Sequence, residues 1–254
     1  MHRFFVETAI EAVGQKVTLS KEESVHATRV LRLKPGETVQ LLDGEALYAG
    51  EIEMASEQGV SVSVNERLPS VEPSVRVTLF QGLPKADKLE WIIQKATELG
   101  VWEVVPMEMA RCVAKADRAE KREKKRERYQ RISLEAAKQS GRAHVPNIKE
   151  PKSFGSVCQE LEKSPSCFDA VFVAWEEEQA LSFSKAVQAW QKTMAEPLER
   201  VALVIGPEGG ISPEECVQLK KGGAISVTLG KRILRTETAG LCALSVLWAA
   251  LGEM

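Results

Sequence analysis

The spacing of apolar residues along the chain changes near residue 70, and this change divides the sequence into two regions. In the first, apolar and polar residues alternate in short runs, as over residues 60–64 and on both sides of Asp43-Gly44, a dipeptide typical of hairpin turns. In the second, unbroken apolar runs such as residues 75–81 and 170–174 are separated by stretches with helical spacing. The pattern predicts a small β-rich domain of the barrel type, followed by an α/β domain with a parallel sheet.

The boundary between the regions lies in the segment LPSVEP at residues 68–73, where two prolines interrupt both kinds of spacing. We therefore place the domains at residues 1–68 and 74–254. A helix is predicted over residues 87–99, between two apolar strands, because its apolar residues recur every three or four positions. Further helices are expected over residues 117–140 and 182–194, and a buried one within residues 239–251.

Two loops in the last quarter of the chain have an unusual composition. Each follows an apolar strand, at residues 201–205 and 224–229, and each leads into a helix. The first reads GPEGG from residue 206, and the second reads GKRILR from residue 230, followed by TET. Ligands of open α/β sheets bind outside the carboxyl ends of the strands, so these two loops are expected to form one site.

The first loop suits a neutral or cationic ligand held by backbone groups. Its glycines let a ligand approach the backbone closely. Ser212, Pro213 and Glu215 then form the pattern of a capping box with proline at the first helical position. A glycine-rich loop at a helix start can bind phosphate, but Glu208, Glu214 and Glu215 would repel a pyrophosphate, and the Gly-Lys-Ser/Thr of a P-loop is missing.

The second loop is basic. Lys231, Arg232 and Arg235 surround Ile233 and Leu234. Apolar residues flanked by cations suit a flat, partly apolar ligand that lies next to a polyanion. The alternative is an ordinary approach to a helix with solvated charges.

The net charge of −2 over 254 residues argues against a nucleic-acid partner, but the distribution of charge favours one. Residues 111–142 carry twelve Lys and Arg against five Asp and Glu, a local charge of +7 that leaves −9 for the rest of the chain. Such asymmetry fits a basic face that meets a polyanion.

The five cysteines form no C-x-x-C pair and have no neighbouring histidines, which indicates free thiols and no metal site. We therefore expect a reducing, cytoplasmic location. The N-terminal MHRFFVETAI lacks the apolar run of a signal peptide, and no stretch has the length of a membrane span.

Motifs in four parts of the chain, in this order, resemble those of the RsmE family of ribosomal RNA methyltransferases, which belong to the SPOUT superfamily. They are HATRVLR from residue 26, QKATELG from residue 94, QSGR from residue 139, and the pair IGPEGGISPEE and LGKRILRTETA from residues 205 and 229. The resemblance covers nearly the whole chain. It implies methylation of N3 of a uridine in 16S ribosomal RNA with S-adenosylmethionine as cofactor, on assembled 30S particles or on naked RNA.

The same resemblance implies a fold. Residues 1–68 would form a PUA-like RNA-binding β-barrel, and residues 74–254 would form a SPOUT methyltransferase domain of α/β class. In this superfamily the C-terminal third contains a trefoil knot, and the protein is a homodimer built around it.

The resemblance also assigns the cofactor site. It places S-adenosylmethionine in a bent form between the two loops, with Glu208 toward its polar end and Ile233 and Leu234 against adenine. The residues that it assigns to the cofactor are Gly206, Pro207, Glu208, Gly209, Gly210, Leu229, Gly230, Ile233, Leu234, Arg235 and Thr236.

Catalysis requires a way to remove a proton, because N3 of uridine is protonated at neutral pH. Arg142 and Arg235 are the candidates for stabilising the developing oxyanion, and Glu237 is a candidate for the base. In SPOUT enzymes an arginine from one subunit completes the site of its partner, and Arg142, just past a predicted helix end, fits that role. Its alternative is a simple hydrogen bond to a helix carbonyl.

RNA contacts are predicted at His26, Arg29, Arg32, Lys85 and Arg142. The first three recur at a spacing of three, so that a short helix would place them on one face. The alternative is a short helix that packs Val25, Val30 and Leu31 and leaves its charges solvated. Lys85 follows a predicted strand and is as easily a solvated lysine as a substrate contact.

Three other functions remain open. A SPOUT enzyme could methylate a ribose 2′-hydroxyl or a guanine nitrogen, although the PUA-like domain and the pairing of the two loops favour uridine N3. A non-catalytic assembly factor could merely bind ribosomal RNA, although it would not need both ligand loops. A metabolic nucleotide-binding enzyme is disfavoured by the missing phosphate fingerprint and the segregated basic charge.

Overall fold

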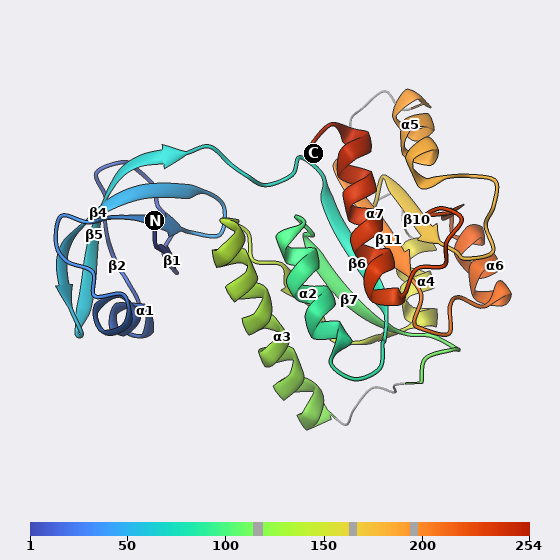
Figure 1. The fold of residues 1–254 in the computed structure, drawn as a ribbon, viewed down its shortest axis with the longest axis horizontal. Coiled ribbons are helices and arrows are strands. Elements are labelled where there is room, and N and C mark those ends of the chain that lie inside the picture. Colours follow the sequence, from blue (N-terminus) through green and yellow to red (C-terminus); the bar gives the residue numbers. More distant parts are fainter. Residues whose placement is uncertain (114–118, 163–166, 194–197) are drawn as a thin grey trace. The chain divides into compact units, whose positions relative to one another are not determined.

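The computed structural model describes residues 1–113, 119–162, 167–193 and 198–254 (Figure 1). Backbone contacts divide the chain into two compact units. The first comprises Met1–Glu72 and Ala137–Val145, and the second comprises Pro73–Ala136 and Pro146–Met254. The division after Glu72 falls within the proline-bounded segment singled out in the sequence. The return of residues 137–145 to the first unit has no counterpart in the hydrophobic pattern.

The first unit is built on a curled five-stranded sheet (Figure 1) with the strand order β1-β3-β4-β5-β2. Its elements are β1 (Arg3–Phe5), β2 (Lys16–Thr18), α1 (Lys21–Val25), the π-helical turn η1 (His26–Val30), β3 (Thr38–Leu42), β4 (Leu47–Ser56) and β5 (Gly59–Leu68). The predicted hairpin at Asp43-Gly44 is confirmed, because β3 and β4 pair antiparallel. The Asp43 carboxylate accepts hydrogen bonds from the backbone N–H groups of Glu45 and Ala46, which fixes the turn.

The HATRVLR segment differs from the single short helix that was predicted. It forms the π-helical turn and then leaves helical geometry, with Arg32 at a positive φ of 56°. His26, Arg29 and Arg32 therefore do not share one face of a regular helix. The packing alternative holds in part: Leu31 packs against the core of the first unit and Val25 is half-buried, but Val30 is 66% exposed.

The second unit contains a parallel sheet with the strand order β12-β10-β11-β6-β7-β8, in which β9 also pairs with β7. Its strands are β6 (Arg76–Gly82), β7 (Glu103–Glu108), β8 (Asn147–Ile148), β9 (Lys152–Ser153), β10 (Ala170–Ala174), β11 (Arg200–Ile205) and β12 (Ile225–Val227). Its helices are α2 (Lys88–Glu98), α3 (Ala119–Ser140, the last four residues of which belong to the first unit), α4 (Phe154–Glu162), α5 (Phe183–Thr193), α6 (Pro213–Lys221) and α7 (Thr236–Leu251).

Two hydrophobic layers cover the faces of this sheet. On one face, α2, α5 and α7 pack against alternate strand residues such as Leu79 and Leu203. On the other face, α4 and α6 pack against the intervening residues such as Phe80 and Val204. The strands are therefore buried on both sides, which explains their unbroken apolar runs.

Most predicted elements of the second unit are confirmed. Helix α2 buries the expected apolar stripe, and the chain turns at Gly100 with a positive φ of 87°. Strand β12 is shorter than the predicted residues 224–229. The predicted starts and ends at Asp117 and Met194 lie outside the described residues. Within the described ranges, no helix is long and apolar enough to cross a membrane.

Candidate active site

A cavity of about 480 Å³ opens at the carboxyl edge of the second unit's sheet. Its walls are the three segments that follow β10, β11 and β12, together with Lys88 and Ala239 from the helices α2 and α7. This volume is typical of sites for small-molecule ligands. The two unusual loops line this one cavity, as expected from their positions at the carboxyl ends of two strands, and all the residues that the family resemblance assigns to the cofactor line it as well.

The glycines of the first loop are required by close packing. At Gly209 an added Cβ would lie 2.9 Å from the backbone oxygen of Arg111. Gly210 has a positive φ of 73°, and an added Cβ there would overlap the carboxylate of Glu176. The N–H of Gly210 donates to the carbonyl of Pro207 at 3.0 Å, which closes the loop into a tight turn.

A chain of buried hydrogen bonds joins the two loops. The hydroxyl of Thr236, the first residue of α7, donates to the carbonyl oxygen of Gly206 at 2.6 Å. Because its only proton is used there, its oxygen must accept from the Gln81 side chain, whose Nε2 lies 2.8 Å away. Nε2 also donates to the Gly82 carbonyl, and among the described residues Gln81 Oε1 has no hydrogen-bond partner. Gln81, at the end of β6, thus fixes the position of both loops.

A lysine joins two acidic side chains at the start of α2. Lys88 Nζ lies 3.1 Å from Glu208 Oε1 and 3.2 Å from Glu237 Oε2. The pKa of Lys88 is raised above its ordinary value, chiefly by its hydrogen bond to Glu208 and to a lesser extent by the one to Glu237. Burial alone would raise the pKa of Glu208, but hydrogen bonds from the backbone N–H of Lys85 and from Lys88 hold it below its ordinary value. The Glu208 carboxylate is therefore a compensated charge.

The predicted crowd of three glutamates at the first loop is only partly present. Glu208 faces the cavity, whereas Glu215 turns away from it: its Oε2 accepts from the N–H of Ser212 and its Oε1 from that of Ala110. The capping box is thereby confirmed, and α6 is tied to the loop after β7. Glu214 does not line the cavity, but Glu176, after β10, does. Arg111 Nη1 lies 4.0 Å from the Glu176 carboxylate.

The second loop has a fixed base and an exposed tip. Gly230, at a φ of 121°, and the hydroxyl of Thr228 exchange hydrogen bonds at its start. Leu234 is half-buried, whereas the side chain of Ile233 is 88% exposed although its residue lines the cavity rim. Lys231, Arg232 and Arg235 are exposed, and in the part of the chain that the structure describes no carboxylate pairs with them.

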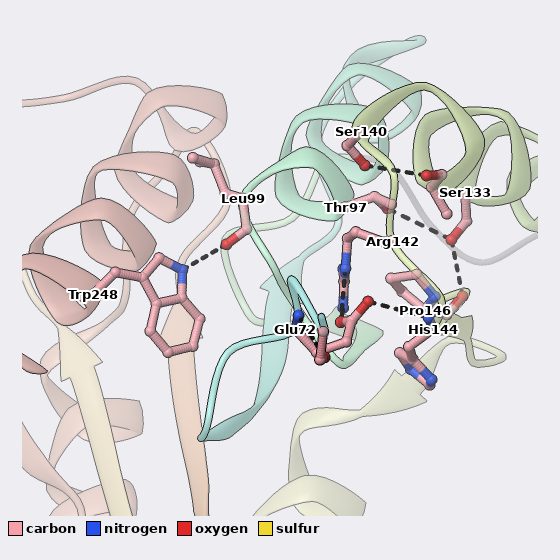
Figure 2. A network of polar contacts seen from close by, with 11 residues as sticks. Glu72, Thr97, Leu99, Ser133, Ser140, Arg142, His144, Pro146 and Trp248 are labelled. Carbon is pink, nitrogen blue, oxygen red and sulfur yellow. Dashed lines mark hydrogen bonds and ion pairs between the residues drawn. The ribbon is translucent and has the colours of Figure 1, made fainter. Parts of the chain in front are cut away.

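Arg142 does not line the cavity. It lies in the first unit, only 3% exposed, and its Nε and Nη2 donate to Glu72 Oε2 at 3.0 and 2.6 Å (Figure 2). The other Glu72 oxygen accepts from the N–H of His144, and the Arg142 backbone N–H donates to the Ala137 carbonyl. The planar guanidinium thus binds a carboxylate of its own chain.

The predicted RNA contacts other than Arg142 are exposed. His26, Arg29 and Arg32 lie on the surface of the first unit, and Arg29 pairs with Glu57. Lys85 is exposed in the loop before α2, with its backbone N–H bonded to Glu208. Of the catalytic candidates, Arg235 lines the cavity, whereas Glu237 does not line it and pairs with Lys88.

Sequence reasoning missed Gln81, Lys88, Trp175 and Glu176. The strand ending at residue 174 was predicted, and the rule that ligands bind at the carboxyl edge would have added Trp175 and Glu176 to the site. Gln81 ends a predicted strand at the same edge, but its contact with Thr236 joins residues 155 positions apart. No local pattern indicates that contact.

Comparison with known families gives two matches that together cover most of the chain. Residues 71–248 match the RNA methyltransferase domain, and residues 19–65 match the RNA methyltransferase PUA domain. The second match lies within the β-rich first unit, and the first includes the whole cavity.

Individual relatives agree with these matches. The chain is 36% identical to ribosomal RNA small subunit methyltransferase E of Bacillus subtilis, over 97% of this chain and 96% of that protein. The crystal structure of ribosomal RNA small subunit methyltransferase E from Neisseria gonorrhoeae, bound to S-adenosylmethionine, has a TM-score of 0.81 at 28% identity and covers 98% of this chain and 97% of its own. A Legionella pneumophila methyltransferase in complex with the same cofactor has a TM-score of 0.76 at 32% identity, with coverage of 98% and 97%.

Proposed function

The chain belongs to the ribosomal RNA small subunit methyltransferase E family, and on this basis we propose that it transfers a methyl group from S-adenosylmethionine to N3 of a uridine in 16S ribosomal RNA. The observation that carries the proposal is the cavity whose walls are the two loops with the family's motifs. Residues 1–68 would bind RNA, and residues 74–254 would hold the cofactor, perform the reaction and form a dimer. The free cysteines accord with a cytoplasmic location.

The cavity suits S-adenosylmethionine in size, polarity and charge. Leu229 and Leu234 offer an apolar wall to adenine, and the backbone of the two loops offers hydrogen bonds. Glu208 and Glu176 place carboxylates beside a ligand that carries positive groups. When bound, this cofactor supplies a methyl group already activated by a positive sulfur, so the protein has chiefly to hold donor and acceptor in line.

Removal of the N3 proton would be assisted at the start of α7. Arg235 caps this helix at the cavity rim, and its exposed guanidinium is free of carboxylate partners among the described residues. The amino-terminal end of a helix carries partial positive charge, so Arg235 and α7 together would stabilise a uracil oxyanion. Glu237, two residues further, is the candidate base, and its approach to the uridine requires movement away from Lys88.

A trefoil knot in the C-terminal third and a homodimer are further parts of the proposal, and both rest on family membership. The role of Arg142 in the partner's site is a separate prediction. Its guanidinium would first have to leave Glu72, so this role implies a rearrangement of the first unit on RNA binding.

The test uses tritiated S-adenosylmethionine with 30S particles, and separately with naked 16S ribosomal RNA, both from cells that lack this protein. Digestion to nucleosides identifies the labelled base. We expect label in 3-methyluridine with the wild type and none with a Glu208→Ala/Arg235→Ala double variant, whereas Lys185→Ala on the exposed side of α5 should label normally. Label in another nucleoside would refute the acceptor, and cofactor binding without any label would favour a binding role.

A further inference from the structure

We propose that Ile233 is a wedge that enters the RNA base stack where the target uridine leaves it, while Lys231 and Arg232 hold the flanking phosphates. This inference rests on the proposed function and extends it to the way in which the target base reaches the cavity. It concerns the tip of the loop between β12 and α7.

Ile233 has the largest exposed fraction, 88%, among the exposed large hydrophobic side chains of the described residues. Single apolar residues on a surface need no explanation by themselves. Ile233 differs in its place, because it stands at the rim of the cavity in which the methyl donor is proposed to bind. An apolar side chain at that position is adjacent to any base that enters.

The charges around Ile233 indicate a polyanion. Two other basic residues near the site have partners: Lys88 pairs with Glu208 and Glu237, and Arg111 approaches Glu176, whereas Arg235 has no carboxylate partner among the described residues. Lys231 and Arg232 are exposed, with no carboxylate paired to them in the described ranges. Three consecutive loop residues span at most about 10 Å, which is close to the rise of three stacked nucleotides at about 3.4 Å each. The loop can therefore contact two phosphates and the base step between them.

The proposed reaction requires such a device. N3 lies on the Watson–Crick edge of uracil, so a stacked or paired uridine must turn out of its strand before this atom can enter the cavity. The gap that it leaves is apolar and flat. Proteins that unstack nucleic acid insert apolar side chains, isoleucine among them, into such gaps. A β-branched side chain suits this role because its χ1 rotation is restricted before binding.

The base of the loop would keep the wedge in place. Thr228 and Gly230 fix its start by reciprocal hydrogen bonds, and the Thr236 hydroxyl ties its end to Gly206. Leu234 is half-buried and turns to the protein, so the two neighbouring apolar residues have different surroundings. We assign Leu234 to the cofactor wall and the Ile233 side chain to RNA.

The test compares Ile233→Ala with Ile233→Leu, and uses Val217→Ala, an exposed valine on α6, as the matched control. Each variant is assayed on two RNA fragments that contain the target uridine, the one that receives the tritiated methyl group. In one fragment both neighbours of the uridine are intact, and in the other the following nucleotide lacks its base. A 2-aminopurine beside the uridine in a third fragment reports unstacking by its fluorescence.

We expect Ile233→Ala to lower kcat/KM at least about 10-fold on the intact fragment, since the inserted apolar side chain that offsets the cost of unstacking is truncated. On the fragment without the neighbouring base, and in the Kd for S-adenosylmethionine, the change should stay within about twofold. The 2-aminopurine signal should be lost with Ile233→Ala and retained with Ile233→Leu. The Val217→Ala control should match the wild type.

Three results would overturn the wedge. One is an equal loss on both fragments, and another is a loss that follows the Kd for S-adenosylmethionine. The third is a change of oligomeric state in Ile233→Ala, which would place the side chain against a second copy of the chain. A wild type that labels no uridine would refute the proposed function itself, and the wedge with it.

Discussion

Replacement of Thr236 by valine tests the hydrogen-bond chain that joins the two loops. The side chain keeps its shape, but the hydroxyl that donates to Gly206 and accepts from Gln81 is removed. Thr236 is 5% exposed, so water cannot easily replace the hydroxyl. The Gly206 carbonyl loses its side-chain donor, while Gln81 Nε2 keeps its bond to Gly82.

The expected cost follows from this count of lost partners. A buried polar group left without a partner costs about 1–3 kcal/mol. In this variant the Gly206 carbonyl loses the hydroxyl donor, whereas the Gln81 amide still donates to the Gly82 carbonyl. We therefore expect the free energy of unfolding of the second unit to fall by about 2 kcal/mol. For a unit of this size that corresponds to a melting temperature about 4–8 °C lower.

Tryptophan fluorescence measures this change in the second unit alone, because all five tryptophans of the chain lie in that unit. Thr236→Ser is the matched control, since it keeps the hydroxyl and loses only a methyl group. The Kd for S-adenosylmethionine should also rise in the valine variant, because both loops line its proposed cavity. If the valine and serine variants unfold at the same urea concentration and bind the cofactor equally, the hydrogen-bond chain does not position the loops.

Three further predictions concern single side chains. Gly209→Ala should weaken cofactor binding because its Cβ would lie 2.8 Å from the Cβ and 2.9 Å from the backbone oxygen of Arg111, whereas Gly155→Ala, with open space around it, should bind the cofactor normally; calorimetric titration distinguishes them. The pKa of Glu208 is lowered in the folded protein, so its stabilising contribution is present above the unfolded pKa of about 4.3 and is lost as the pH falls through the folded value. The difference in unfolding free energy between wild type and Glu208→Gln should therefore shrink below about pH 4.3 and stay constant above pH 5 or so, as urea titrations across pH would reveal. Arg142→Met leaves the partly buried carboxylate of Glu72 without its cation and should destabilise the first unit by about 3–5 kcal/mol. Addition of Glu72→Gln to this variant should recover most of the loss in circular-dichroism melts. Lost methylation at unchanged stability would instead support a catalytic role for Arg142.

Local patterns predicted most of the fold. The capping box at Ser212 and the hairpin at Asp43-Gly44 depend on neighbours within a few residues, and both are confirmed. The carboxyl-edge rule brought the loops after residues 205 and 229 into one cavity without any knowledge of the strand order.

The errors occur where distant residues decide. The charge of Glu208 is compensated by Lys88, which lies 120 positions earlier in the chain, so composition alone overstated the negative charge of the loop. The role of Arg142 in a partner's site stays a prediction, but its binding of Glu72, a contact across 70 positions, is not indicated by any local pattern. At Arg32 the π-helical turn overrides the simple three-residue spacing.

The discontinuous first unit has a consequence for synthesis of the protein. Residues 1–72 emerge from the ribosome first, but the rest of their unit, residues 137–145, is made much later. That later segment supplies Lys138, which pairs with Glu23, and Arg142, which pairs with Glu72. It also supplies Ala143, which packs with Leu42 and Leu47. Domains that are contiguous in sequence can fold as soon as they emerge. Here the first part of the chain to emerge stays incomplete until more than half of the protein has been translated, and the Glu72 carboxylate lacks its Arg142 partner until the chain is 70 residues longer.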